Sequence, residues 1–137
     1  MLQRSLELEE LVRTWFAAAS IGEASVIDRH VSRDPAARLI GSDPTERYAG
    51  EEVARFLRGE VEGAGGKARF TPTETEAFSE GTVGWATTLL TITLPDGRSV
   101  SPRWSAVFHR EDDEWRFVQT HASIAVPNDE VGWQYPG

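Results

Sequence analysis

The second half of the sequence is a succession of strand-like segments separated by short turns. Between residues 67 and 126, β-branched and aromatic residues are frequent and alternate with polar ones, which is typical of strands. We predict four strands, at residues 67–78, 82–94, 98–110 and 115–126. The turns between them hold Glu80-Gly81, Pro95-Asp96-Gly97 and Asp112-Asp113, and Asp-Gly is a strong hairpin signal. Strands this long twist and coil, so the antiparallel sheet that they form must curl around another layer.

The first half of the sequence supplies that layer. Apolar residues recur every three or four positions between residues 2 and 20, opposite charged ones, which predicts an amphipathic helix. We predict a shorter helix at 23–31, a short strand at 37–40, a turn-rich loop at 41–50 and a third helix at 51–61. Helices gathered on one face of an antiparallel sheet define the α+β class. The sequence therefore predicts a cone-shaped, strongly curved antiparallel sheet wrapped around N-terminal helices.

The length of 137 residues is near the commonest size of a single domain. We predict one domain over residues 1–126, followed by a C-terminal tail at 127–137 that is not a separate domain. The tail lacks periodicity, but Trp133 and Tyr135 suggest that it docks on the domain or on a neighbouring molecule.

The charge of the chain argues against two classes of partner. Its 22 acidic residues exceed its 14 basic ones, and the net charge of −8 repels phosphate backbones and anionic lipids. We therefore predict no nucleic acid partner and no membrane partner. The N-terminal residues contain no apolar stretch long enough for a signal peptide or a membrane span, so a cytoplasmic location is expected.

Metal and cofactor sites are not expected either. The chain has no cysteine, which excludes disulfides, thiolate metal ligands and thiol nucleophiles. His30, His109 and His121 lie in separate segments without the spacing of metal ligands. The Gly-rich segment at 63–66 lacks the Lys-Ser/Thr ending of a phosphate-binding loop. We predict no metal and no cofactor.

Four stretches, together with the order of the elements, carry a resemblance to a known superfamily. The stretches are Leu39-Ile40-Gly41-Ser42-Asp43-Pro44, Gly81-Thr82-Val83-Gly84-Trp85-Ala86, Leu94-Pro95-Asp96-Gly97-Arg98 and Trp115-Arg116-Phe117-Val118-Gln119-Thr120-His121-Ala122-Ser123. Over residues 2–126 the chain resembles the nuclear transport factor 2-like superfamily and its SnoaL-like domains, and the last stretch is also similar to the association domain of calcium/calmodulin-dependent kinase.

This resemblance implies a cystatin-like α+β roll, a cone whose open mouth admits small apolar ligands. The superfamily includes ketosteroid isomerases, polyketide cyclases, dehydratases and epoxide hydrolases, together with many non-catalytic dimerisation modules. Because one fold hosts all of these, the function has to be argued from the residues of the site.

Asp43 is the first candidate catalytic residue. The isomerase-like chemistry that the resemblance implies needs a carboxylate base in the loop after the first strand, where Asp43 lies, although Gly41 falls closer to the base position. Asp43 could instead be a turn residue whose carboxylate binds neighbouring backbone N–H groups. Trp15 and Phe16 stand where that chemistry would need a Tyr hydroxyl. Trp104 and Ser105 stand where it would need an acid, and the isomerase mechanism is therefore disfavoured.

His121 is the second catalytic candidate. It alternates with Ser123 on the last predicted strand, so both side chains share a face. The pair could be a polar lining, half of a hydrolytic pair, or a hydrogen-bonded histidine at a sheet or dimer surface. Residues two apart on a strand lie about 7 Å from each other, too far for a direct bond between serine and histidine.

A ligand pocket is predicted inside the cone. Trp15, Trp85 and Trp104 come from the helix and the two strands expected around it, and they could wall a pocket for a flat apolar ligand or be ordinary core. Arg103 could meet a carboxylate ligand at the mouth or form a cross-strand salt bridge. The predicted lining is Trp15, Phe16, Phe56, Trp85, Arg103, Trp104, Thr120 and Ser123.

Three functional hypotheses follow. The first is a SnoaL-like binding or interaction module that holds a small, mainly apolar molecule and forms a homodimer through the outer face of the sheet. The second is an isomerase, cyclase or hydrolase for a small hydrophobic carbonyl or epoxide substrate, with Asp43 or His121 as acid/base. The third is a structural, partner-binding domain whose pocket has collapsed.

Overall fold

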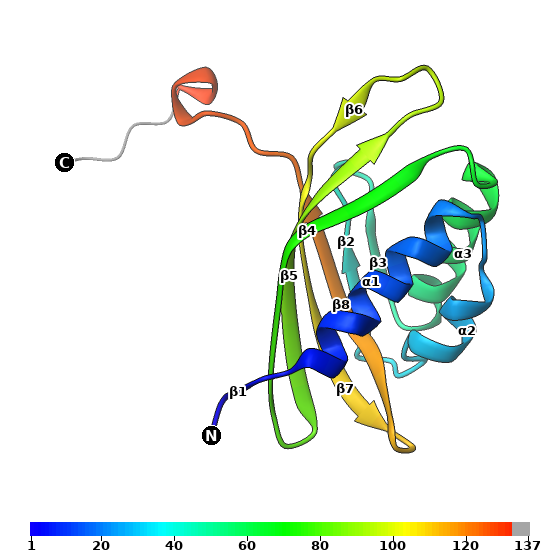
Figure 1. Ribbon diagram of the computed structural model, residues 1–137, viewed down its shortest axis with the longest axis vertical. Coiled ribbons are helices and arrows are strands. Elements are labelled where there is room, and N and C mark those ends of the chain that lie inside the picture. The colour runs from blue at the N-terminus through cyan, green and yellow to red at the C-terminus, as the bar shows by residue number, and fades with distance from the viewer. Residues whose placement is uncertain (133–137) are drawn as a thin grey trace.

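A single curved sheet forms the body of the molecule (Figure 1). The computed structural model describes residues 1–132, and within them eight strands belong to this sheet. The strand order is β1-β4-β5-β7-β8-β2-β3, with β6 alongside β5. The strands are β1 (Gln3–Arg4), β2 (Arg38–Ile40), β3 (Arg47–Ala49), β4 (Arg69–Glu80), β5 (Val83–Thr93), β6 (Ser99–Val100), β7 (Arg103–Glu111) and β8 (Glu114–Ser123).

The long strands β4, β5, β7 and β8 form the antiparallel meander that the turn signals predict. The third predicted strand, at 98–110, is divided into β6 and β7, with Pro102 between them. Proline lacks the backbone N–H that would continue the ladder, which accounts for the break. The fourth predicted strand ends at Ser123, earlier than the sequence pattern indicates.

Three helices lie against this sheet: α1 (Leu6–Ser20), α2 (Ser25–His30) and α3 (Glu51–Ala64). The first helix begins later than predicted, because the Ser5 side chain accepts a hydrogen bond from the backbone N–H of Leu8 at 3.2 Å and caps the helix there. The residues before it pair with β4 as β1. At the other end of the helical half, Gly65 has a left-handed conformation with φ of 56° and ends α3.

Two short strands occupy the far edge of the sheet. β2 runs parallel to β8, with Leu39 opposite Thr120, and β3 pairs with β2 in antiparallel fashion. The sheet is therefore mixed rather than wholly antiparallel. β3 lies in the segment predicted to be a loop, because a three-residue strand is too short to show a period of two.

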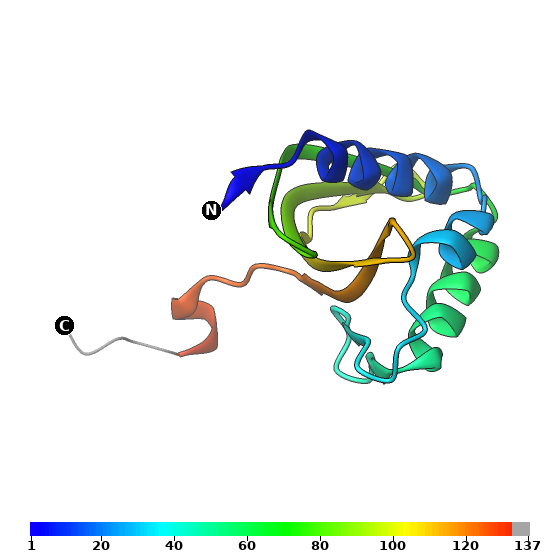
Figure 2. The same cartoon turned by 90° about the horizontal axis from the view of Figure 1, so that it is seen from below.

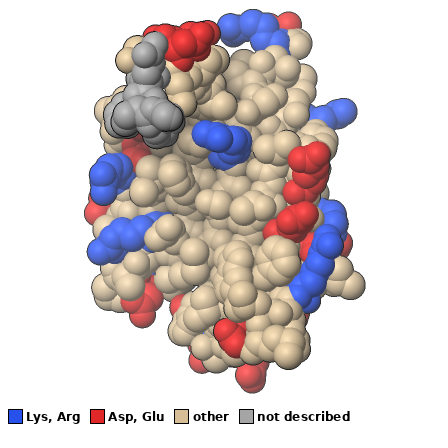
Figure 3. All heavy atoms as spheres, turned by 90° about the vertical axis from the view of Figure 1, so that its left-hand side faces the viewer, with Lys and Arg blue, Asp and Glu red and all other residues tan. Residues whose placement is uncertain are grey.

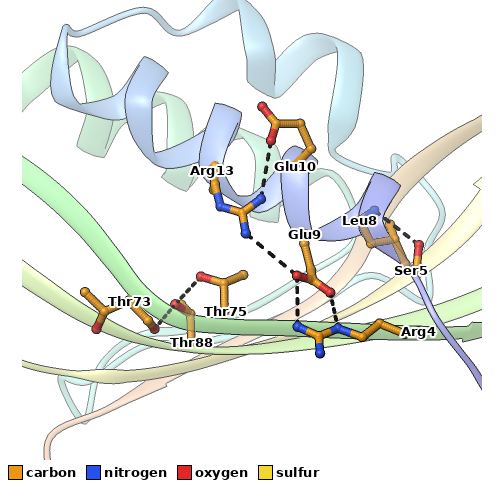
Figure 4. A network of polar contacts seen from close by, with 9 residues as sticks. All are labelled: Arg4, Ser5, Leu8, Glu9, Glu10, Arg13, Thr73, Thr75 and Thr88. Carbon is orange, nitrogen blue, oxygen red and sulfur yellow. Dashed lines mark hydrogen bonds and ion pairs between the residues drawn. The ribbon is translucent and has the colours of Figure 1, made fainter.

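Two bulges bend the long strands. In β4 the register shifts at Glu74, whose φ is 50°, and in the β7–β8 pair it shifts between the pairs 107–119 and 108–117. At the first bulge the buried Thr88 hydroxyl donates to the Thr73 carbonyl at 2.8 Å and lies 2.9 Å from the Thr75 hydroxyl (Figure 4). Figure 2 shows the strands curving beneath α1. The predicted α+β class, with a curved sheet over N-terminal helices, is confirmed.

The core lies between α1 and the inner face of the sheet. Leu8, Val12 and Trp15 of α1 are buried there against Phe108 and Phe117, which are also buried. The rings of Trp15 and Phe117 are 4.5 Å apart, and those of Phe108 and Phe117 are 4.6 Å apart. These contacts hold α1 across the strands. They thereby also position the other side chains of α1, including Phe16 and Ala19.

Close packing of α1 on β5 depends on Gly84. A Cβ atom at this position would lie 2.3 Å from Cδ1 of Leu8 and 3.1 Å from the carbonyl oxygen of Phe78. The absence of a side chain therefore lets the helix approach the strand.

Glu9 ties α1 to the edge of the sheet (Figure 4). Its buried carboxylate accepts a hydrogen bond from Nε of Arg4 at 2.7 Å and lies 3.7 Å from Arg13 of the next turn. The hydrogen bond from Arg4 is the largest cause of the lowered pKa of Glu9. The covering side chains of Arg4 and Arg13 are half exposed, so this carboxylate is buried only shallowly.

Beyond β8 the chain extends away from the sheet to a short 3-10 helix, η1 (Asn128–Val131) (Figure 1). The docking predicted for Trp133 and Tyr135 lies outside the described residues, and the predicted domain boundary at residue 126 stays a prediction. Among residues 1–132, no helix is both long and apolar enough to span a bilayer.

Candidate functional site

The strands divide the predicted site residues between two faces of the sheet. On β7 and β8, Trp104 and Thr120 are buried on the inner face, which the helices cover. Their neighbours Arg103 and His121 are exposed on the outer face. Successive residues of a strand point to opposite faces, so this separation follows directly from the register.

The inner face contains a pocket of about 410 Å³ between α1, α3 and the strands. Its walls are mainly apolar, and five aromatic side chains contribute to them: Trp15, Phe16, Phe56, Phe70 and Trp104. Four of the predicted lining residues from the helices and β7 are in this set, and Thr120 of β8 also lines the pocket. The pocket is therefore a place where α1, α3 and the meander meet.

The aromatic walls are also part of the core. The ring of Phe16 stands edge-on to that of Trp104 at 5.0 Å and is stacked with that of Phe70 at 6.3 Å. Trp104 in turn lies 6.0 Å from Phe117, which does not line the pocket. One side of these rings packs against core residues and the other faces the pocket. Trp15 and Trp104 are therefore core residues that also line the pocket.

One end of the pocket is open to solvent. Val100 and Ile124 line it and are 39% and 53% exposed, and Ser42 beside them in the lining is exposed as well. A small molecule could therefore enter without displacing a helix.

Glu46 and Glu60 bring negative charge into this apolar lining. The Glu46 carboxylate lies over Gly41, where a Cβ atom would be only 2.6 Å from its Oε1, and it accepts a hydrogen bond from the backbone N–H of Asp43 at 2.9 Å. Glu60 is an exposed residue of α3, and the protein covers its side chain only in part. This partial burial, and secondarily the negative charge of Glu46, raises the pKa of Glu60.

Our sequence reasoning missed both glutamates. Glu60 follows Phe56 by four residues and precedes Ala64 by four, so it lies on the apolar stripe of α3, and an acid in such a stripe is a usable signal. Glu46 carried no comparable signal, since only the turn between β2 and β3 directs its carboxylate over Gly41.

Asp43 is an exposed residue of that same turn. Its carboxylate accepts hydrogen bonds from the backbone N–H of Thr45 at 2.9 Å and from the Thr45 hydroxyl. The bond from the hydroxyl is the largest cause of the lowered pKa of Asp43. Asp43 is not among the residues that line the inner pocket.

The outer face carries a wider groove of about 820 Å³. His121 and Ser123 lie side by side in it, as their spacing predicts, opposite Ser105 and Arg103 on the neighbouring strand. Glu76 also lines the groove. The groove is larger than the inner pocket, but it is more open and its lining is more polar, so its size alone does not make it the better ligand site.

Trp85 lies on this outer face too, where its ring stacks with that of Phe78 at 6.3 Å. We predicted that Trp85, Arg103 and Ser123 line the pocket, but the structure places all three on the outer face. The reason is strand parity: Gly84 and Ala86, on either side of Trp85, are buried against the helices, so Trp85 must point away.

No metal centre is evident in the part of the chain that the structure describes, since no group of three or more His, Asp or Glu side chains could hold an ion there. The inner pocket and the outer groove each bring residues from several elements together.

Comparison with known proteins gives the family. The sequence model of the SnoaL-like domain matches residues 8–127 of the chain. No curated protein sequence matches it significantly.

Solved structures show the same fold at low sequence identity. A nuclear transport factor 2-like protein of unknown function from Pseudomonas putida KT2440 superposes with a TM-score of 0.74 at 15% identity, covering 90% of this chain and 88% of that one. The association domain of CaMKII from C. elegans gives 0.68 at 16% identity, with 85% and 92% covered. A proposed ketosteroid isomerase from Shewanella frigidimarina gives 0.67 at 14% identity, with 83% and 92% covered.

Proposed function

The chain belongs to the SnoaL-like domain family, and we propose that it is a binding module that holds a small, mainly apolar molecule in the inner pocket and forms a homodimer through the outer face of its sheet. One observation carries the first part: the pocket of about 410 Å³, walled by aromatic side chains and open at one end. Ligand sites are typically about 300–1,000 Å³ in volume, mainly apolar, with a few polar groups that orient the ligand.

Ligand binding can be tested with a library of small apolar molecules in a thermal-shift screen. A ligand at 100 times its Kd adds about 2.7 kcal/mol to the free energy of unfolding, which raises the melting temperature by several degrees. The change Ala122→Leu fills part of the pocket and should abolish the shift. Ala49→Leu, the same change at an exposed residue of β3 outside the pocket, should retain it.

Two results would contradict this part of the proposal. If no molecule shifts the melting temperature, the structural hypothesis with a collapsed pocket becomes the better one. If Ala122→Leu binds a hit as tightly as the unchanged protein, the ligand occupies another site.

The homodimer is supported by the composition of the outer face. Phe78, Trp85 and Val107 are half-buried there, and Val83 and Leu89 are 42% and 45% exposed. Figure 3 views this face: uncharged surface fills most of its centre, and most charged side chains lie toward the margins. Such a surface is typical of protein interfaces. The CaMKII domain from C. elegans has the same fold and is named an association domain, which also supports this part.

Sedimentation at micromolar concentration tests the dimer. We expect a dimer for the unchanged protein and a monomer for Val107→Arg, which places a charge in the centre of the apolar surface. Ile21→Arg is the matched control, since Ile21 is 74% exposed at the end of α1 and away from the outer face. A monomer for the unchanged protein would overturn this part alone.

The enzymatic alternative has weaker support. The carboxylate of Asp43 is engaged by Thr45, and His121 faces the outer groove rather than the apolar pocket. Their roles as acid/base, and the cytoplasmic location, remain predictions from the sequence.

A further inference from the structure

The charge of the inner pocket is one-sided. Its ionisable lining residues within residues 1–132 are Glu46 and Glu60, with no Lys, Arg or His among them. The nearest arginine along α3, Arg58, pairs instead with Asp28 and with Glu62, one turn away and outside the lining. An apolar pocket with two acidic groups and no basic one has a negative potential that a bound ligand must match.

The Glu46 carboxylate is held in place by its own turn. The backbone N–H of Glu46 donates to the carbonyl of Asp43 at 2.9 Å, and the backbone carbonyl of Glu46 accepts from the N–H of Gly41 at 2.8 Å. The N–H of Asp43 donates to Oε1 at 2.9 Å, which directs the carboxylate over Gly41 and into the lining. The hydrogen bond from Asp43 therefore orders the Glu46 side chain before any ligand binds, which lowers the entropy cost of binding beside it.

Glu60 faces the same space from α3. Partial burial is the larger cause of the raised pKa of Glu60, and the negative charge of Glu46 raises it further. This repulsion is a cost when the pocket is empty, and a positive charge placed beside the carboxylates would relieve it.

The aromatic walls also favour a positively charged ligand. The faces of indole and benzene rings carry a negative quadrupole that attracts ammonium groups, and Trp15, Trp104 and Phe56 line the pocket. The lining contributes only two carboxylates, and no group of three or more His, Asp or Glu side chains that could hold a metal ion is present in residues 1–132. The ring faces and the carboxylates are independent observations that agree.

We propose that the inner pocket takes an organic cation: a primary or substituted amine, carried as ammonium on a hydrophobic body, with the charge beside Glu46 and Glu60 and the body against the aromatic walls. This inference rests on the proposed ligand-binding function and names the ligand class of that same pocket.

Three molecules of matched size test it by titration calorimetry: 4-phenylbutylamine, 4-phenylbutan-1-ol and 4-phenylbutyrate. At low salt the amine should bind about tenfold more tightly than the alcohol, a difference of about 1.4 kcal/mol from the added charge pair, and the carboxylate should bind most weakly. Raising the ionic strength should reduce the affinity for the amine and leave that for the alcohol unchanged.

The double change Glu46→Gln with Glu60→Gln should remove the preference for the amine while preserving affinity for the alcohol. Glutamine keeps the oxygen that accepts the Asp43 N–H, so the turn is maintained. The control Glu62→Gln removes one negative charge from the same helix outside the pocket and should keep the preference.

The outcomes separate the two proposals. Equal affinities for all three molecules would overturn the cation inference and leave ligand binding intact. A preference that survives the double change would also overturn it, since the charge would then be recognised elsewhere. No binding of any of the three would count against both proposals.

Discussion

The inner and outer faces of the sheet are built from the same strands but have opposite environments. On β7, Trp104 and Phe108 are buried on the inner face, whereas Arg103 is exposed and Val107 is half-buried on the outer face. The inner face is closed by helices except at the aromatic pocket, and the outer face is an open, mixed surface. One strand thus carries a core and an exposed surface that can evolve separately, because alternate side chains do not touch each other.

The largest effect that distinguishes the faces is expected from a matched pair of phenylalanine truncations. Phe108→Ala removes a fully buried ring and should reduce the free energy of unfolding by about 3–5 kcal/mol. Phe78→Ala removes a half-buried ring on the outer face and should cost about 1–2 kcal/mol. Urea denaturation at low protein concentration measures both. Equal losses would mean that the outer face is covered as completely as the inner one.

A smaller effect is expected where the inner face meets α1 most closely. Gly84→Ala places a methyl group against Leu8 and the Phe78 carbonyl and should cost about 1–3 kcal/mol. Gly59→Ala, within α3 and with no heavy atom in reach of the new methyl, should stabilise the protein by roughly 0.5–1 kcal/mol. Thermal denaturation compares them. If Gly84→Ala were as harmless as Gly59→Ala, the helix would have room to move away from β5.

Glu9, at the margin of the inner face, should make the free energy of unfolding depend on pH. The pKa of Glu9 is lowered by the hydrogen bond from Arg4, so the folded protein binds fewer protons at this site than the unfolded chain. The resulting stability is complete above the ordinary carboxyl pKa of 4.5 and is lost as the pH falls through the lowered folded value.

The variant Glu9→Gln should therefore be less stable than the unchanged protein at pH 7, by about 1 kcal/mol since Arg4 is half exposed, and this difference should shrink on acidification toward pH 3. Chemical denaturation of both proteins at several pH values measures it. The control Glu10→Gln changes an exposed neighbour and should show no such trend. A constant difference across the series would contradict the role of the Glu9–Arg4 bond.

The smallest effect is expected on the outer face. His121→Gln should change the free energy of unfolding by no more than about 0.5 kcal/mol and leave binding in the inner pocket unchanged, because the side chain is exposed in the groove. The adjacent change Thr120→Phe should block the pocket, since Thr120 lines it. Titration of the same ligand into both variants measures this. Loss of binding in His121→Gln would return that residue to the list of site candidates.

The fold was largely predictable because its signals are local. Asp96-Gly97 and the alternation on either side of it predict a hairpin without reference to the rest of the chain, and the spacing in α1 predicts its apolar face. The strands β1 and β3 escaped prediction because two or three residues carry no period. They form only because a neighbouring strand offers its free edge.

The site was predictable in part. Trp15, Phe16 and Trp104 could be predicted to line the pocket because large aromatic side chains on the helix and strands around it are normally buried between them. Trp85 was placed with them because it has the same residue type, and its parity on β5 puts it on the other face. A type of side chain can be read from the sequence, but its direction depends on which neighbours touch the helix.

By itself, the sequence determined the helices, the four-strand meander and the alternation of side chains along each strand, because turn chemistry and the periods of 3.6 and 2 act over a few residues. Only the tertiary structure decided which half of each alternation faces α1, and that Glu46 and Glu60 meet at one pocket from a turn and a helix. The physical reason is that a pocket is enclosed by atoms from distant segments, and their distances are set by packing rather than by any local preference.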